Sequence, residues 1–141
     1  MLKRLAVLLG AMLCALLVGC SNMSSFELTA KTDVQTVAKW EYFEVIVYTK
    51  NTGAPYSYRG SSTKVGADAA LYIETSDGRS YLTAMPIAVT SDYRHVTIKR
   101  NEVITTMWTF YVEESAPQGE YTLLLSFQET KVEIPQFITV E

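Results

Sequence analysis

The sequence predicts an all-β sandwich of about seven or eight antiparallel strands. Three observations lead to this prediction. Apolar and polar residues alternate from residue 26 onward, turn signals recur roughly every ten residues, and all 16 aromatic residues (2 Trp, 9 Tyr, 5 Phe) follow residue 20. Only residues 33–41 would also fit a helical face. Regular turn spacing without convincing helical periods favours a sandwich or barrel over a fold with alternating strands and helices.

The first 19 residues have the three parts of a secretory signal. Lys3 and Arg4 give a positively charged start, residues 5–18 carry no charge, and small residues precede Cys20. The apolar run spans about 14 residues, whereas a membrane-spanning helix needs roughly 20. We therefore expect residues 1–19 to be removed, which leaves 141 − 19 = 122 residues, the size of one domain.

The end of this segment, Leu17-Val18-Gly19-Cys20, resembles the lipobox of bacterial lipoproteins. The resemblance implies a diacylglycerol on the Cys20 thiol, with residues 20–25 as a short tether and 26–141 as the folded domain. More than one acyl chain is what stable anchoring needs. The expected location is therefore the outer leaflet of a plasma membrane or an outer membrane, facing away from the cytoplasm. The alternative is an ordinary or uncleaved signal with an incidental cysteine.

Cysteine content and charge exclude several classes of function. Cys14 would leave with the signal and Cys20 would be acylated, so no cysteine nucleophile, thiolate metal site or disulfide remains. Removal of two basic residues changes the balance from 12 − 15 to 10 − 15, or −5. A negative domain has no electrostatic attraction for nucleic acid or anionic lipid, so we expect the lipid alone to attach it to the membrane.

The first half of the domain contains four expected strands. Residues 26–31 and 42–49 alternate in polarity, although the second segment has one mixed face that includes Tyr42 and Tyr48. Residues 56–66 have no core pattern and predict a long loop or a short edge strand. Two apolar runs, 70–75 and 80–85, then flank Asp77-Gly78, which is a strong hairpin signal.

The second half adds four more strands. Residues 96–99 alternate, and in 104–112 four apolar residues share one face with Thr106. Residues 121–127 follow a glycine-containing turn. The last segment, 132–140, is interrupted by Pro135, which predicts an edge or a bulge.

The segment Pro117-Gln118-Gly119-Glu120-Tyr121-Thr122-Leu123 resembles a turn and strand of immunoglobulin-like domains. Gly119 would allow a positive φ, and Tyr121 could bury its ring while its hydroxyl reaches back to the backbone as a tyrosine corner. Leu123 stands where antibody-type domains have a cysteine. The resemblance therefore implies the broader immunoglobulin-like group.

Three features in order resemble bacterial immunoglobulin-like domains of the BsuPI proteinase-inhibitor type. They are the strand end at 50–53, the Asn101-Glu102 turn before the Trp108 strand, and the corner at 119–121. The resemblance implies proteinase inhibition as an alternative function.

Catalytic and metal-binding patterns are absent from the sequence. His95 is the only histidine, so a multi-histidine metal site is impossible. Glu113 and Glu114, if they lie on a strand end, would point to opposite faces and would not converge as an acid and a base. We therefore expect a protein that is not an enzyme and has neither a cofactor nor a metal site.

The best candidate for a binding surface is the Tyr-, Arg-, Ser- and Gly-rich stretch 55–62. Tyr56, Tyr58 and Arg59 are its candidate contact residues, because tyrosine provides a large contact area at low entropic cost. The alternative is that these tyrosines pack over the end of the sandwich. The expected function is a membrane-anchored, non-catalytic module that binds another envelope protein or a cell-envelope polymer.

Overall fold

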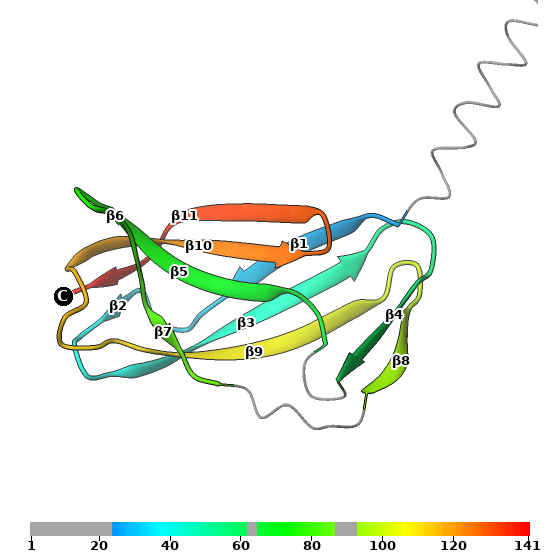
Figure 1. Ribbon diagram of the computed structural model, residues 1–141, viewed down its shortest axis with the longest axis horizontal. Coiled ribbons are helices and arrows are strands. Elements are labelled where there is room, and N and C mark those ends of the chain that lie inside the picture. Colours follow the sequence, from blue (N-terminus) through cyan, green and yellow to red (C-terminus); the bar gives the residue numbers. More distant parts are fainter. Residues whose placement is uncertain (1–23, 62–64, 87–92) are drawn as a thin grey trace, which may run out of the picture.

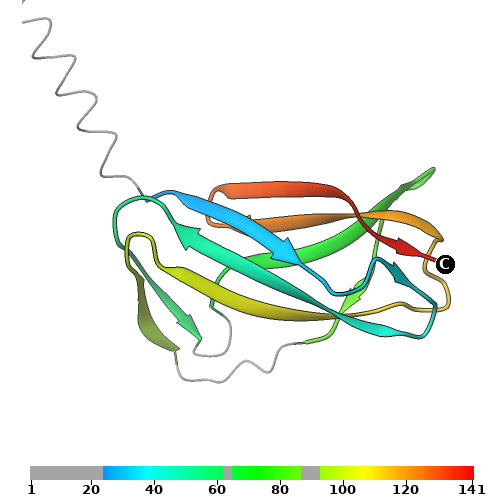
Figure 2. The same ribbon diagram turned by 180° about the vertical axis from the view of Figure 1, so that it is seen from behind.

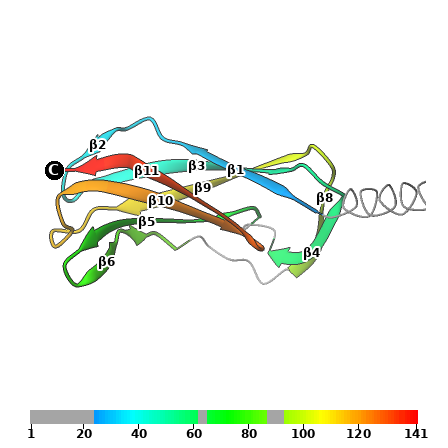
Figure 3. The ribbon, with the colours of Figure 1, turned by 90° about the horizontal axis from the view of Figure 1, so that it is seen from above.

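The computed structural model describes residues 24–61, 65–86 and 93–141, and these form an all-β sandwich (Figures 1 and 3). Within these ranges there are 11 strands and no helix. The strands are β1 (Phe26–Lys31), β2 (Thr36–Val37), β3 (Tyr42–Asn51), β4 (Tyr56–Ser61), β5 (Asp68–Thr75), β6 (Gly78–Tyr81), β7 (Thr83–Ala84), β8 (Tyr93–Ile98), β9 (Val103–Tyr111), β10 (Gly119–Phe127) and β11 (Thr130–Val140).

Two sheets make up the sandwich. The first has the order β1-β3-β9-β7, and the second has the order β2-β11-β10-β5-β6. This is the strand order of an immunoglobulin-like sandwich, with the small β2 added in parallel to β11. All other neighbours pair antiparallel. The facing sides of the two sheets bury the core, whose fully buried members include Val45, Val47, Phe110, Leu71, Leu123 and Leu125.

The predicted number of strands was too low. Two of the additional strands, β2 and β7, are only two residues long, and so short a segment has no period that a sequence pattern can reveal. The stretch with no core pattern forms β4, which pairs with β8 in a separate two-stranded sheet. The ambiguous segment 33–41 contains β2 and a turn rather than a helix.

The expected turns are confirmed in detail. The hairpin signal joins β5 to β6, and Gly78 has a φ of 122°. The register of β10 against β11 shifts opposite Pro135, so this proline lies at a bulge, and the next residue, Gln136, has a φ of 53°. Gly119 has a φ of 138° and the buried Tyr121 donates its hydroxyl to the Pro117 oxygen at 2.9 Å, which forms the tyrosine corner.

The two ends of the sandwich differ in what they join. At one end β1 begins, and Ser25 accepts a backbone hydrogen bond from Thr52 at 2.8 Å. We call this the tether end, because the segment that leads back to Cys20 meets the domain here (Figure 1, right). The opposite end, where β2, the β2–β3 turn and the β9–β10 turn lie, is the distal end (Figure 1, left).

The lipobox and the acylation site Cys20 lie outside the described residues. In the part of the chain that the structure describes, no helix has the length and apolar character needed to cross a membrane.

At the tether end the buried side chain of Asn51 connects three segments. Its Nδ2 donates to the oxygens of Ala54, at 2.8 Å, and Ile98, at 2.9 Å, and its Oδ1 accepts from the Gly53 nitrogen at 3.0 Å. Its backbone also pairs with Asn101 and Glu102. This polar centre fixes the β3–β4 and β8–β9 turns against each other.

Candidate functional site

The structure places the three residues of the sequence-predicted binding surface on β4. The rings of Tyr56 and Tyr58 are half-buried at the tether end, with centroids 5.9 Å apart. Both contact Phe127 edge-on, and Tyr56 also contacts Phe26 at 5.4 Å. Burial raises the pKa of Tyr58. Much of these two rings therefore packs over the end of the core.

The third residue, Arg59, is exposed and pairs across the sheet with His95, which is also exposed. In the described residues, Arg59 therefore does not form one binding surface with the rings of Tyr56 and Tyr58.

A second group of aromatic side chains lies at the distal end of β3 and β9, on the face of the β1-β3-β9 sheet that is turned away from the core. This sheet is in front in Figure 2. Trp40 and Tyr42 are each 60% exposed, and both pack against Tyr111. The ring centroids of Tyr42 and Tyr111, which face each other across β3 and β9, are 4.6 Å apart with 30° between the planes. The Trp40 and Tyr111 centroids are 6.4 Å apart with 54° between the planes.

The turn that presents Trp40 is held to the end of β9 by backbone hydrogen bonds. The Trp40 nitrogen donates to the Val112 oxygen at 2.7 Å, and the Val112 nitrogen donates to the Glu41 oxygen at 3.0 Å. Glu41 also accepts from the Ala38 nitrogen through Oε2, at 3.0 Å. The backbone that carries the indole is therefore fixed to the end of the sheet.

Trp40 has a left-handed backbone conformation, with a φ of 71°. This region costs an L-residue with a Cβ about 1–2 kcal/mol, and bulky residues rarely adopt it. Glycine or asparagine would fit this position better. Because the ring is also largely exposed, Trp40 is a poor choice for stability, and such local strain clusters at functional sites.

Trp40 and Tyr111 line an open hollow of about 610 Å³ together with Glu113, Glu114 and Ser115. We call these five residues the distal hollow. Strand β9 ends at Tyr111, so Glu113 and Glu114 lie in the turn region that follows, where the strand alternation assumed for them does not apply. In that turn both border the same hollow.

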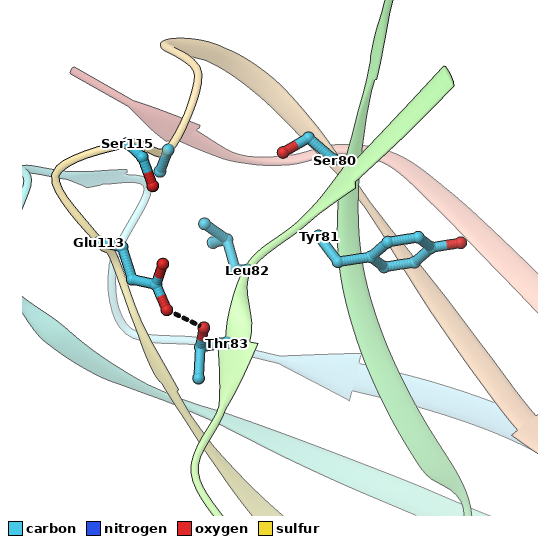
Figure 4. A pocket seen from close by; sticks show the side chains of 7 residues that line it. Ser80, Tyr81, Leu82, Thr83, Glu113 and Ser115 are labelled. Carbon is cyan, nitrogen blue, oxygen red and sulfur yellow. Dashed lines mark hydrogen bonds between the residues drawn. The ribbon is translucent and has the colours of Figure 1, made fainter. Parts of the chain in front are cut away.

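A smaller polar hollow of about 160 Å³ also borders Glu113 (Figure 4). Thr83 donates its hydroxyl to the Glu113 carboxylate, and Leu82 and Ser115 also border the space. The ring of Tyr81 points away from Glu113. Glu113 and Ser115 line both hollows, so a ligand in the distal hollow would contact a carboxylate that is already oriented by Thr83.

The electrostatics of the distal end are dominated by carboxylates. Burial, followed by the nearby Tyr42 and Glu113, raises the pKa of Tyr111. Lys39 is the adjacent cation, and its ammonium donates to the main-chain oxygen of Glu114 at 2.7 Å rather than to a carboxylate. In the described residues neither Glu113 nor Glu114 takes part in an ion pair.

The distal end presents a limited set of side-chain groups. The exposed His95 lies on β8 at the far side of the sandwich, so it does not meet the two glutamates. Across residues 24–61, 65–86 and 93–141, no group of three His, Cys, Asp or Glu side chains could hold a metal ion. Aromatic faces, carboxylates and a hydroxyl remain as contact groups.

Comparisons with known proteins support the fold and nothing beyond it. No family model and no curated protein match the chain. Among solved structures, it is similar to the β-glucosidase EmGH1 from Erythrobacter marinus (16% identity, TM-score 0.51) and to a β-glucosidase from Listeria innocua in complex with glucose (14%, TM-score 0.51). The matched region is 84% and 83% of this chain, respectively, but only 16% of each enzyme.

A third similar structure is Spo0M, a sporulation control protein from Bacillus subtilis, at 17% identity and a TM-score of 0.51. That match covers 84% of this chain and 50% of Spo0M. The chain thus spans about one sixth of the enzymes and half of Spo0M. At these identities the similarity supports the sandwich fold and assigns no activity.

Proposed function

We propose that the chain is a non-catalytic binding module, anchored by lipid on Cys20 to the outer leaflet of a plasma membrane or to an outer membrane. Its binding surface is the exposed aromatic group Trp40, Tyr42 and Tyr111 with the adjoining distal hollow. The partner is another protein or a polymer of the cell envelope.

The observation that supports this proposal is the exposure of two large rings at positions where they add little to the core. Trp40 and Tyr42 are each 60% exposed, and Trp40 also has an unfavourable backbone conformation. Aromatic side chains are enriched in binding interfaces, and adjacent exposed ones mark contact surfaces. Farther along the same outer face, beyond Glu44 and Thr109, Met107 is 53% exposed.

The position of this surface fits a tethered module. Strand β3 runs from Tyr42 at the distal end to Asn51 at the tether end, and ten residues span roughly 30 Å at about 3.3 Å per residue. The five residues between Cys20 and Phe26 reach at most roughly 17 Å. A short tether would therefore keep the domain near the bilayer, and the aromatic surface lies at the end of the domain away from the tether.

A pull-down from solubilised envelope with the affinity-tagged full chain tests the binding surface. We expect the variant Trp40→Ala with Tyr42→Ala to lose the partner and the variant Tyr58→Ala with Arg59→Ala to keep it. Loss in the second variant alone would assign binding to β4, and an unchanged partner set in both would reject both surfaces.

Mass spectrometry of the protein taken from cells tests the anchor separately. We expect a chain that begins at Cys20 and has the added mass of a diacylglycerol. An unmodified thiol at this position would refute lipidation and leave the binding surface untouched.

Proteinase inhibition of the BsuPI type stays an alternative prediction. The residues behind that resemblance have structural roles. Asn51 fixes the turns at the tether end, Glu102 accepts from the Lys99 nitrogen through Oε2 at 2.6 Å, and Tyr121 closes the corner. These roles account for the resemblance through the fold. Slowing of a protease at a near-stoichiometric ratio of the full chain would support inhibition.

A further inference from the structure

We infer that the distal hollow binds a basic side chain, the guanidinium or ammonium group of an arginine or lysine on a polypeptide partner. This inference rests on the proposed function and adds to it the chemical class of the ligand.

The walls of the hollow supply the first half of a cation site. A cation is attracted to the face of an aromatic ring within about 6 Å of its centroid, most strongly to tryptophan. The planes of Trp40 and Tyr111 lie at 54° to each other, so the rings are not stacked, and both border the open space. An elongated group that enters the hollow contacts both rings.

The rim of the hollow supplies the opposite charge. Glu113 and Glu114 line it, and in the described residues no lysine or arginine forms an ion pair with either carboxylate. Lys39 donates to the Glu114 main-chain oxygen instead. Thr83 donates one hydrogen bond to Glu113, which orients its carboxylate and leaves other lone pairs for a donor.

These features favour arginine and lysine over an uncharged ligand. A planar guanidinium can stack on an aromatic face and donate in parallel to a carboxylate, and an ammonium can make the same two contacts with less directionality. A sugar could also stack on Trp40 and donate its hydroxyls to the carboxylates, but it would bring no positive charge to the two glutamates.

A polypeptide is the occupant that the surrounding surface fits. Tyr42 lies beside the hollow, and farther along the same outer sheet face, beyond Glu44 and Thr109, lie the half-exposed Ile46 and the exposed Met107. Aromatic residues, methionine and arginine are the residue types enriched at protein interfaces. A chain that places one basic side chain in the hollow can lay apolar neighbours along this face.

The test measures the anisotropy of a dye-labelled pentaarginine peptide with the mature full-length protein in detergent. We expect saturable binding that weakens at least fivefold in Trp40→Leu, which keeps an apolar side chain but removes the ring. Glu113→Gln and Glu114→Gln should each weaken it at least threefold. The control Glu27→Gln removes an exposed carboxylate near the tether end of β1 and should change the affinity less than 1.5-fold.

Two further measurements separate the possible failures. Near-ultraviolet circular dichroism, to which the buried Trp108 contributes, verifies that each variant is folded. Equal losses in Glu27→Gln and Glu113→Gln, or an unchanged affinity in Trp40→Leu, would overturn the inference, because binding would then follow overall charge alone.

Binding of an uncharged hexamer of N-acetylglucosamine tests the alternative ligand, a sugar. Binding of this sugar but not of pentaarginine, lost in Trp40→Leu, would overturn the basic ligand and leave the binding module intact. Failure of the proposed function itself would instead appear as an unchanged partner set in the pull-down.

Discussion

Replacement of Asn51 tests whether the polar centre at the tether end stabilises the fold. Asn51 is fully buried, and its side chain forms three hydrogen bonds of 2.8, 2.9 and 3.0 Å. A typical intramolecular hydrogen bond contributes about 1 kcal/mol net, so Asn51→Ala should lower the free energy of unfolding by about 3 kcal/mol. The melting temperature should then fall by about 12 °C, at roughly 4 °C per kcal/mol for a domain of this size.

In the variant Asn51→Asp, the free energy of unfolding should depend on pH. The new carboxyl would face the oxygens of Ala54 and Ile98, to which only a protonated group could donate. Burial therefore raises its pKa in the folded state above the value of about 3.9 in the unfolded chain. The unfolded state releases its proton first as the pH rises, so stability is highest below pH 4 and falls above it by up to about 1.4 kcal/mol per pH unit.

Urea unfolding between pH 3.5 and pH 7, followed by tryptophan fluorescence, measures both effects. Gln118→Glu is the matched control, because it makes the same change from amide to acid at an exposed position. A loss below about 1 kcal/mol in Asn51→Ala would refute the stabilising role of the three bonds. A pH profile of Asn51→Asp that parallels the control would show that the carboxyl stays in water.

Three further substitutions have expected outcomes that unfolding and melting experiments check. Tyr121→Phe removes the 2.9 Å hydrogen bond to Pro117 and should cost about 1 kcal/mol in urea unfolding, so an unchanged midpoint would contradict the corner. Gly119→Ala places a Cβ at a φ of 138° and should cost about 1–2 kcal/mol, and a gain in stability would argue against this conformation. Trp40→Asn should change the free energy of unfolding by less than about 1 kcal/mol, because relief of the left-handed strain offsets lost ring contacts, and a loss above 2 kcal/mol in thermal melting would show that the indole is structural.

The main strands could be predicted from the sequence because each has a long alternating pattern of apolar and polar residues. Phe43, Val45 and Val47 share one face of β3 in the sequence and are all buried in the core. The alternating pattern did not predict β4, because its half-buried face consists of Tyr56 and Tyr58, and tyrosine also suits an exposed loop. Whether these rings pack or lie exposed depends on Phe26 and Phe127, which only the tertiary fold brings to them.

The distal hollow was harder to predict for two physical reasons. Composition marks tyrosine-rich stretches as contact surfaces, but a single tryptophan in the Lys39-Trp40-Glu41 turn has no such pattern. The directions of the Glu113 and Glu114 side chains were predicted from strand geometry, which does not apply to residues beyond the end of β9 at Tyr111. The mixed outer face of β3 was visible in the sequence, and its Tyr42 is the one signal that pointed toward this surface.

Trp40 also separates stability from function in this domain. Its turn needs a residue with a φ near 71°, and asparagine or glycine would meet that need without the cost of about 1–2 kcal/mol that a larger side chain brings. An indole that is 60% exposed recovers only part of this cost through contact with Tyr111. The unfavourable conformation and the large exposure of this ring together support the proposed contact with a partner. Glu113 and Glu114 beside it form no ion pair in the described residues, which supports the proposal that this contact supplies a positive charge.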